Sequence, residues 1–533
     1  MNRRLTRVPL LCLLLSVVMS AGLLAAAAPA GAAGPRGFSW TPHLTQIAAA
    51  GIGHDPGSWQ NSYPWSMCMF NGDLYVATGR VGCTSAVMSL MAGPMGGGGA
   101  ELPGGKILGN APQPPQIKDF LSDDGASVKD KTKYDAFNAL SRAEIYRYHC
   151  GTWERVFQAQ MIPSYLQGPA APYSAAAITG FRGIKVFTDV HGVRAIYAAA
   201  GGFTFAAQQP LMMRSTDGVT WTPIYAPPAM GRESRALWVH HGRLYVGVGY
   251  SGLGGKVEAG AWASADPGAN ADPTGAFNWT KVIDFPTLDS TNTNVVSFAT
   301  YFGRLYLGTE NRTGFQVWRS KVADPAANRD WTKVVTGGAG MGVNEWAGTM
   351  KVFGGWLYVG SMHVPGISGS TQVKGFDLIR VSPWNTWQLV IGDPRAAVTP
   401  FGTRTMTPIS GKPSGMGNPL NLYCWSLAVK DGQLYLGTFD LTTMLKHSGI
   451  PDAQIAVMLG LSVAQVQKLY AGAGGDLYST WNGCSWKTRT LTGFGNEFDY
   501  GFRNIVAAPS GLYFGLSDPF FGCAVWALQG TWW

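Results

Sequence analysis

Short apolar runs alternate with turn residues throughout the stretch from Asn294 to Thr336. The runs are VVSFATYF, RLYLGTE, FQVWRS and WTKVVT, and segments containing Gly, Asp, Asn or Pro separate them. Short runs that are rich in β-branched and aromatic residues are typical of strands. Four such runs within 43 residues match the length of one propeller blade. The pattern therefore predicts a four-stranded antiparallel meander.

The same unit recurs along the chain, with one tyrosine in its second run and one tryptophan in its fourth. The tyrosines are Tyr75, Tyr197, Tyr245, Tyr306, Tyr358, Tyr435 and Tyr513. The tryptophans are Trp153, Trp221, Trp279, Trp331, Trp387, Trp486 and Trp532. Large aromatic side chains at fixed places fill the space between neighbouring blades, so we expect them to be core residues. The predicted fold is all-β: one seven-bladed β-propeller of four-stranded antiparallel blades over residues 34–533.

The two ends of this region are predicted to meet in the last blade. The sequence FSWTPHL, from Phe38 to Leu44, is similar to the outer-strand sequence TWTPIY at 220–225. The final repeat is cut short, at Trp533. We expect the N-terminal segment to pair with the final blade, which closes the ring and leaves no open sheet edge.

Long insertions interrupt the repeat on a single face. In a four-stranded meander, the connection between the second and third strands lies on the same side as the connection between blades. The insertions at such connections are Val81–Arg142, Met362–Gly375, Arg404–Asn421 and Leu441–Gly474. Short helices are expected around IPDAQIAVML, at Ser462–Tyr470 and at Tyr134–Leu140. The insertions 81–142 and 441–474 are predicted to cap the mouth of the central channel.

The first 33 residues have the organisation of a signal peptide. A basic start is followed by the apolar run Val8–Ala28, and A-x-A cleavage sites lie after Ala30 or Ala32. The Sec route is expected, because the residues after the Arg3-Arg4 pair fit a twin-arginine (Tat) signal poorly; an uncleaved membrane anchor is the alternative. No other stretch approaches the roughly 18 apolar residues of a membrane span. We therefore expect a secreted, extracellular protein with no membrane contact after cleavage.

The charge pattern argues against a nucleic-acid partner. The formal net charge is +9, and it falls to +6 without the three arginines of the signal segment. No run of Lys or Arg forms a nucleic-acid footprint, and the mild positive charge favours anionic partners. A monomer is expected.

Six cysteines remain once the signal segment is removed: Cys68, Cys83, Cys150, Cys424, Cys484 and Cys523. An even number in an exported chain predicts three disulfides, and no CxxC spacing points to a metal cluster. Met67 and Met69 beside Cys68 suggest copper, but inner-strand methionines are more often core. The segments ADPGANADP and ADPAAN offer oxygens for calcium, although an extended hairpin turn suits them better. No metal and no cofactor is predicted.

The repeat resembles the tandem-repeat propellers of exported bacterial proteins, which are loosely related to Kelch-like and Asp-box propellers. The unit that carries this resemblance is clearest from Leu305 to Trp331. RSTDGVTW, from Arg214 to Trp221, is similar to a sialidase Asp box with its glycine one place early, and YSTWNGCSW is an eroded version. The resemblance covers residues 38–533 and implies the architecture, but no particular activity.

Candidate site residues come from positions that end the second strand or begin the first, because these should surround the channel mouth on the decorated face. The candidate catalytic residues are Glu345, Glu497, Asp499 and His363. The candidate ligand-binding residues are Arg80, Arg235, Glu310, Trp346, Tyr423, Asp440, Tyr500 and Arg503. Two carboxylates suit glycoside hydrolysis, and a His with a Tyr suits a uronide lyase. Aromatic rings stack on sugars, and Arg pairs with a sugar carboxylate.

Two interpretations of these positions stay open. Water in any propeller channel favours polar residues at its mouth, and the contexts GVNEW and GFGNEF also suit a hydrogen bond that joins blades. The leading hypothesis is a secreted carbohydrate-active protein, a glycoside hydrolase or a polysaccharide lyase, acting on an extracellular glycan of acidic character. The alternative is a non-catalytic scaffold propeller that binds a glycan or a protein.

Overall fold

The computed structural model describes residues 43–49, 51–53, 58–80, 141–163, 174–200, 212–224, 233–249, 259–271, 278–364, 372–399, 402–448 and 450–530. The predicted signal segment 1–33, the helix predicted at Tyr134–Leu140, and Trp532 lie outside the described residues. The chain divides into two compact units, Met1–Thr41 and Pro42–Trp533, and every described residue belongs to the second.

Four-stranded antiparallel meanders, called blades 1 to 7 here, build this unit. Blade 1 consists of β2 (Tyr63–Phe70), β3 (Asp73–Gly79), β4 (Glu144–His149) and β5 (Thr152–Gln158). Blade 2 consists of β8 (Phe181–Thr188), β9 (Arg194–Ala200), β10 (Met212–Ser215) and β11 (Thr222–Ile224). Blade 3 consists of β12 (Glu233–His240), β13 (Arg243–Gly249), β14 (Gly260–Ser264) and β15 (Thr280–Asp284). Blade 4 consists of β16 (Asn292–Tyr301), β17 (Arg304–Asn311), β18 (Val317–Ser320) and β19 (Trp331–Val335). Blade 5 consists of β20 (Trp346–Phe353), β21 (Trp356–Met362), β22 (Leu378–Val381) and β23 (Trp387–Ile391). Blade 6 consists of β26 (Asn421–Lys430), β27 (Gln433–Asp440), β28 (Leu477–Thr480) and β29 (Lys487–Thr490). Blade 7 is β30 (Gly501–Ala508), β31 (Gly511–Ser517), β32 (Ala524–Gln529) and β1 (His43–Ala48).

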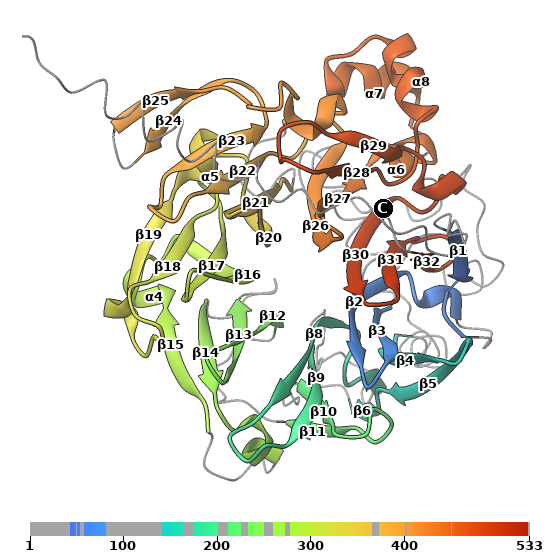
Figure 1. Ribbon diagram of the computed structural model, residues 1–533. Coiled ribbons are helices and arrows are strands. Elements are labelled where there is room, and N and C mark those ends of the chain that lie inside the picture. The colour runs from blue at the N-terminus through green and yellow to red at the C-terminus, as the bar shows by residue number, and fades with distance from the viewer. Residues whose placement is uncertain are drawn as a thin grey trace, which may run out of the picture. The chain divides into compact units, whose positions relative to one another are not determined.

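The first strands of the blades surround a common centre (Figure 1). Within the described residues, β2 contacts β8, and the contacts continue through β12, β16, β20 and β26 to β30, which contacts β2 again. This cyclic order confirms the all-β propeller class. It agrees with the predicted number of seven blades, which stays a prediction because parts of the chain lie outside the described residues.

The N-terminal strand completes the last blade. β1 pairs antiparallel with β32, with His43 opposite Gln529 and Leu44 opposite Leu528. Pairing with the final blade is therefore confirmed, but the pairing strand extends to Ala48 and its start is His43. Residues 38–42 of the predicted strand lie outside the described residues.

The repeated tyrosines are core, as predicted, and so are Trp279, Trp331 and Trp387, whereas Trp153, Trp221 and Trp486 are half-buried. Tyr75, Tyr197, Tyr245, Tyr306, Tyr358 and Tyr435 are each at most 1% exposed. The tyrosine hydroxyl reaches the outer turn of the next blade, because Tyr306 Oη donates to Asn385 Oδ1 at 3.0 Å. The tryptophan links outer strands, because Trp331 Nε1 donates to the backbone oxygen of Val282 at 2.9 Å. Such bonds fasten neighbouring blades, although Tyr245 Oη, Tyr435 Oη, Trp221 Nε1 and Trp486 Nε1 have no hydrogen-bond partner among the described residues.

A one-residue β-bulge interrupts each described first strand at the same level. The residue after the bulge bonds to the next blade in several cases. Ser66 Oγ donates to the Phe181 oxygen at 2.8 Å, and Ser426 Oγ donates to the Phe502 oxygen at 2.7 Å. The bulges therefore help to join neighbouring first strands, and each one turns its extra residue out of the ladder.

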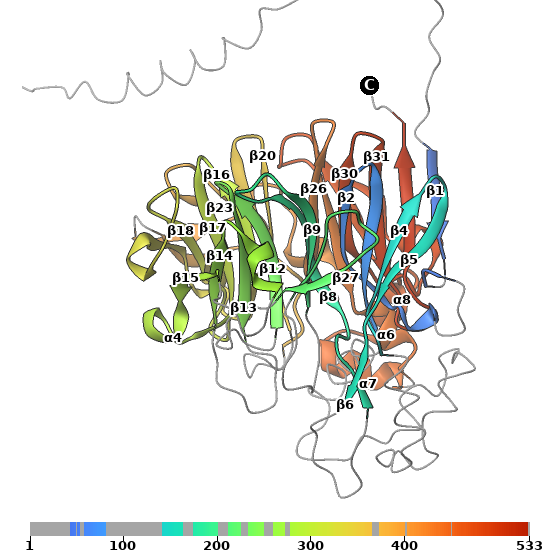
Figure 2. The ribbon, with the colours of Figure 1, turned by 90° about the horizontal axis from the view of Figure 1, so that it is seen from below.

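Short helices occupy the insertions at one end of the strands. α6 (Thr442–Lys446), α7 (Asp452–Leu459) and α8 (Val463–Tyr470) follow β27, and α4 (Phe285–Leu288) joins blades 3 and 4. Figure 2 shows α4, α6 and α7 at the same end. The two helices predicted within 441–474 are confirmed, and the Ser462 hydroxyl caps α8 by accepting a hydrogen bond from Gln465 N. In Figure 1, α7 and α8 lie outward of β28, so capping of the channel stays a prediction.

The smaller elements are α5 (Gly337–Gly340), the hairpins β6 (Met161–Pro163)–β7 (Ser174–Ala176) and β24 (Arg395–Thr399)–β25 (Gly402–Met406), and the 3-10 turns η1 (Ser58–Gln60), η2 (Pro267–Ala271), η3 (Asn328–Asp330), η4 (Ser414–Gly417) and η5 (Gly493–Gly495). In the described part of the chain, no helix combines the length and the apolar character needed to cross a membrane.

The prediction of three disulfides is wrong. Cys68, Cys150, Cys424, Cys484 and Cys523 are all free, and Cys83 lies outside the described residues. Cys68 packs into the apolar cluster between blades 1 and 2, whereas Cys424 packs into the cluster between blades 5 and 6. Strands of separate blades hold these cysteines apart, and an even count does not bring them within bonding distance.

Candidate functional site

The predicted site residues lie at the joints between neighbouring blades. Glu310 at the end of β17 pairs with Trp346 at the start of β20. The prediction that all these residues line an open channel mouth is wrong, because several of them are buried. Arg80, Glu345, His363, Asp440, Asp499 and Tyr500 are buried, whereas Glu310, Trp346, Tyr423, Glu497 and Arg503 are half-buried. The side chain of Arg235 lies outside the described residues. The buried positions bond across the joints, as the Asp440 N–H does to the Tyr500 oxygen at 2.8 Å, and so they lie inside the protein.

Glu345 and His363 form a buried pair, and both are 0% exposed. His363 Nδ1 lies 3.2 Å from Glu345 Oε2 and 2.7 Å from the Val343 oxygen, while Nε2 lies 2.6 Å from the Gln372 oxygen. Burial acts to lower the pKa of His363, but the hydrogen bond and charge of Glu345 outweigh it, so the pKa is raised. Both ring nitrogens face oxygen acceptors, which suits a charged imidazolium that fastens the joint. The catalytic role of these two residues stays a prediction.

A polar network recurs in the described blades, although strand patterns alone do not reveal it. An asparagine before the first strand donates its amide to a side chain before the third: Asn61 to Glu144 (3.0 Å), Asn292 to Gln316 (2.9 Å), Asn344 to Asp377 (2.7 Å) and Asn421 to Asp476 (2.7 Å). The N–H groups of these acceptor residues donate to hydroxyls of the second strand, at Thr78, Thr309, Ser361 and Thr438. Glu144 also holds the guanidinium of the predicted Arg80 at 3.1 Å, inside the protein. Two recurring sequence features, the asparagine and the motif LY-x-x-[TS], could have predicted this network.

Blade 7 departs from this network. Gly501 pairs with Phe439 as Tyr423 pairs with Met362, which puts Asp499 at the asparagine position. Leu516 and Ala524 take the hydroxyl and acceptor positions, because Gly515 pairs with Val525 as Gly308 pairs with Val317 in blade 4. Within the described residues, the two carboxyl oxygens of Asp499 have no hydrogen-bond partner, and the hydroxyl of Ser517 has none either.

Burial raises the pKa of Asp499 well above its ordinary value, and the charge of Asp518 raises it further. Asp518 Oδ1 accepts hydrogen bonds from the N–H groups of Phe520 and Phe521, at 2.8 and 3.0 Å. Burial nevertheless raises the pKa of Asp518 to about 7. These two carboxyl groups therefore favour the protonated form, which is the form that a general acid needs.

Blade 6 holds a second pair of buried carboxyl groups. Asp440 accepts hydrogen bonds from Thr442 N at 2.8 Å and from Asn418 Nδ2 at 3.0 Å. Burial raises the pKa of Asp440, and the charge of Asp476 adds to this effect. Burial also raises the pKa of Asp476, whose carboxylate accepts from Tyr478 Oη at 2.8 Å. The predicted ligand-binding residue Asp440 is thus part of the packed joint.

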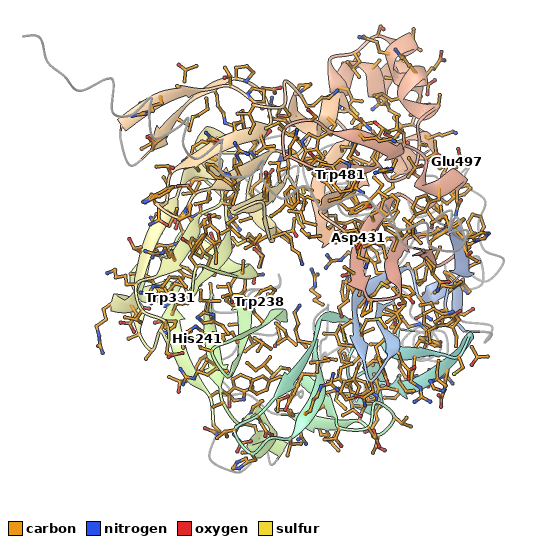
Figure 3. All side chains as sticks on the ribbon, viewed as in Figure 1. Trp238, His241, Trp331, Asp431, Trp481 and Glu497 are labelled. Atoms are coloured by element: carbon orange, nitrogen blue, oxygen red, sulfur yellow. The ribbon has the colours of Figure 1, made fainter. Side chains whose placement is uncertain are left out.

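Glu497 lies toward the outer side of the ring (Figure 3). Lys446 Nζ lies 2.5 Å from its Oε2 atom, and His447 Nε2 lies 3.1 Å from Oε1. Burial acts to raise the pKa of Glu497, but the hydrogen bond and charge of Lys446 outweigh it and lower the pKa. Thr443 Oγ1 also donates to the backbone oxygen of Glu497 at 2.5 Å. The arrangement fastens α6 to the segment before blade 7; a catalytic role for Glu497 stays a prediction.

Two predicted binding residues, Tyr423 and Tyr500, meet in an aromatic cluster. Tyr423 stacks on Phe439 with ring centroids 4.5 Å apart, and Phe439 meets Tyr500 edge-on at 5.0 Å. Trp425 lies 5.8 Å from Tyr500 and 5.9 Å from Tyr63. The cluster therefore joins the first strands of blades 6 and 1 to the start of blade 7.

The extra residues of the bulges form one layer around the centre, called the bulge layer. Its members are Trp65, Arg182, Arg235, Val296, Gly348, Trp425 and Arg503. The guanidinium carbon of Arg182 lies 4.5 Å from the centre of the Trp65 ring, and that of Arg503 lies 5.4 Å from the Trp425 ring. Arg235 and Arg503 were predicted; Arg182 and the two tryptophans were missed, because a bulge shifts a residue out of the alternation that strand patterns follow.

A second layer consists of the first-strand residues that pair with the repeated tyrosines, and it is called the tyrosine-facing layer. Its members are Cys68, Lys185, Trp238, Ala299, Lys351, Ala428 and Val506. Lys185 Nζ lies 4.8 Å from the centre of the Trp238 ring. In Figure 3, Trp238 lies nearer the centre of the ring than Trp331. This layer was not predicted from the sequence, because the candidate residues were taken from strand ends and these residues lie in the middle of the first strands.

Among the described residues, no group of three or more His, Cys, Asp or Glu side chains is placed to hold a metal ion. No protein-family model and no curated protein matches the sequence. Among solved structures, the chain is similar to the GH74 xyloglucanase from Xanthomonas campestris (15% identity, TM-score 0.40, covering 72% of this chain and 50% of that chain) and to the GH43 BlXynB protein from Bacillus licheniformis (10%, 0.26, 49% of each). It is also similar to a subtype N10 neuraminidase-like protein of A/little yellow-shouldered bat/Guatemala/060/2010 (9%, 0.32, 65% and 94%). The chain spans about half the length of the first two, and similarity at this level carries no implication for activity.

Proposed function

We propose that this protein is a secreted carbohydrate-active propeller that binds an acidic glycan in the interior of its ring. The observation that carries the proposal is the pairing of tryptophan faces with cationic groups on the first strands. Arg182 lies over Trp65, Lys185 lies over Trp238, and Arg503 lies over Trp425. Trp65 and Trp425 are buried, so the half-buried Trp238 is the ring on which a sugar stacks, and the cations pair with uronate or sulfate groups of the same glycan.

The charge of the first strands supports an anionic ligand. Within the described side chains, the first strands carry the cations Arg182, Lys185, Lys351 and Arg503 and no carboxylate; Lys430 lies at a strand end, where it pairs with Asp431. An interior wall of one charge sign raises the local concentration of ligands of the opposite sign.

The reaction that fits this ligand is glycoside hydrolysis or uronide elimination. Asp499 and Asp518, whose pKa values burial raises, are the proposed general acids, and Tyr500, next to Asp499 in the chain, belongs to the aromatic cluster. The second candidate is a non-catalytic binding propeller. Two observations favour it: both nitrogens of His363 are engaged, and Glu497 is held by Lys446 and His447.

A glycan panel incubated with the purified protein separates these outcomes. New reducing ends without ultraviolet absorbance of an unsaturated product would indicate a hydrolase, and that absorbance would indicate a lyase. Retention on a polygalacturonate column without either signal would indicate the binding propeller. The R182Q and R503Q variants should be retained less, whereas K430Q should behave like the wild type, because Lys430 pairs with Asp431 at 3.2 Å. Equal behaviour toward neutral and acidic glycans would refute the proposal.

A further inference from the structure

The tyrosine-facing layer contains two lysines and no carboxylate. Lys185 lies opposite Tyr197 in blade 2, and Lys351 lies opposite Tyr358 in blade 5. The remaining members of the layer are Cys68, Trp238, Ala299, Ala428 and Val506. Two cations thus enter one level of the ring from blades that are not neighbours, and nothing in the layer neutralises them.

The surroundings leave the charge of both lysines uncompensated. Lys185 and Lys351 are half-buried, and within the described residues neither takes part in an ion pair or a hydrogen bond. Burial lowers the pKa of Lys185, Cys68 acts to raise it, and the positive charge of Lys351 acts to lower it. Burial also lowers the pKa of Lys351. The two ammonium groups therefore sense each other across the interior, and an anion between them would relieve both effects.

Packing alone accounts for only one of the two lysines. Lys185 gains from the face of Trp238, at 4.8 Å, as a cation over an aromatic ring does. Lys351 shows no such contact among the described residues. A half-buried lysine without a partner costs stability. A bound anion that also contacts Lys185 would offset the cost of placing Lys351 at this level.

We propose that Lys185 and Lys351 hold one acidic group of the ligand in the ring interior, at a level separate from the bulge layer. The inference rests on the proposed function and names its substrate class more closely. Arg182 and Lys185 are three residues apart on β8, which corresponds to about 10 Å along a strand. The ligand is therefore an oligomeric acidic glycan that presents at least two acidic groups about 10 Å apart along its chain.

Titration calorimetry with two uronates tests this inference. Tetragalacturonate should bind the wild-type protein more tightly than monomeric galacturonate does. K185Q and K351Q should each weaken tetragalacturonate binding by about tenfold, which is the effect of losing roughly 1.4 kcal/mol. K430Q serves as the matched control, because Lys430 lies at the end of a first strand and pairs with Asp431. K351Q should not lower the melting temperature, since it removes an uncompensated charge, whereas K185Q also removes the contact with the Trp238 ring.

The outcomes separate the inference from the proposed function. If tetragalacturonate binds and neither lysine variant weakens it, the lysine site is refuted while acidic-glycan binding stands. Sodium sulfate is the probe for a free oxyanion. If sulfate binds through both lysines and tetragalacturonate does not bind, the occupant is an inorganic anion, and both the glycan assignment and the proposed function fail. Binding of neither probe also refutes both.

Discussion

Replacement of Asp518 by asparagine should stabilise the protein at alkaline pH and leave it unchanged at acidic pH. Burial raises the pKa of this carboxyl group from its ordinary value of 3.8 to about 7. The folded state therefore binds the proton more tightly than the unfolded chain. Stability is consequently full at low pH and falls as the pH rises from about 4 to about 7. Asparagine keeps an oxygen that can accept the N–H groups of Phe520 and Phe521.

The size of the effect follows from the shift in pKa. A change from 3.8 to about 7 corresponds to about 4 kcal/mol of unfolding free energy lost by pH 8. The unfolding entropy of the unit Pro42–Trp533 is about 1 kcal/mol/K on the usual scale per residue. D518N should therefore raise Tm by about 4 °C at pH 8 and by less than about 1 °C at pH 4.

Differential scanning fluorimetry at pH 4 and pH 8 measures both values. The matched control is D217N, which should show the opposite sign. Asp217 Oδ1 accepts hydrogen bonds from the Val219 and Thr220 N–H groups at 2.8 Å each, and these bonds lower its pKa. D217N should therefore lower Tm by similar amounts at pH 8 and pH 4, because the stability that an ionised Asp217 contributes is lost only as the pH falls below about 4. A fall in Tm of D518N at pH 8 would show that the protein stabilises an ionised Asp518, and the reasoning would be refuted.

Two further predictions concern the joints between blades. G483A should destabilise the protein by about 2 kcal/mol or more, because its Cβ would lie 1.8 Å from Tyr358 Oη. G192A, at a similar positive φ with no atom within 4 Å of the new Cβ, should show the backbone cost alone in the same urea titration. E345Q should cost about 3 kcal/mol or more at pH 6, because it leaves His363 charged and buried. The pKa of His363 is raised above 6.5, so this loss should shrink at pH 9 as the imidazole deprotonates; an equal loss at both pH values would contradict the ion pair.

The strands could be predicted from the sequence because each blade is a local unit. A run such as RLYLGTE pairs with strands from the same 43 residues, so its turns and aromatic positions are visible in one window. Tyr306 and Trp331 were correctly placed in the core for this reason. The helices α7 and α8 were predicted from Pro451 and Ser462, which precede their first turns.

The candidate site could be predicted only in part. Strand ends correctly brought Glu310 to Trp346, and Tyr423 into the same aromatic cluster as Tyr500. Burial was not predictable, because it depends on the neighbouring blade. Glu345, for instance, belongs to blade 5 but lies 0% exposed beneath the joint, with its backbone oxygen bonded to Asn311 of blade 4.

The sequence by itself determined the strand order, the aromatic contacts between blades and the face that carries the insertions. These depend on periodicity within one repeat, and β-strand geometry makes that periodicity legible. Tertiary structure decided that the described cysteines stay free, that Arg182 lies over Trp65 and that Lys185 and Lys351 share one level. Trp65 and Arg182 are more than 100 residues apart, and only the packing of one blade against the next sets the distance between such side chains.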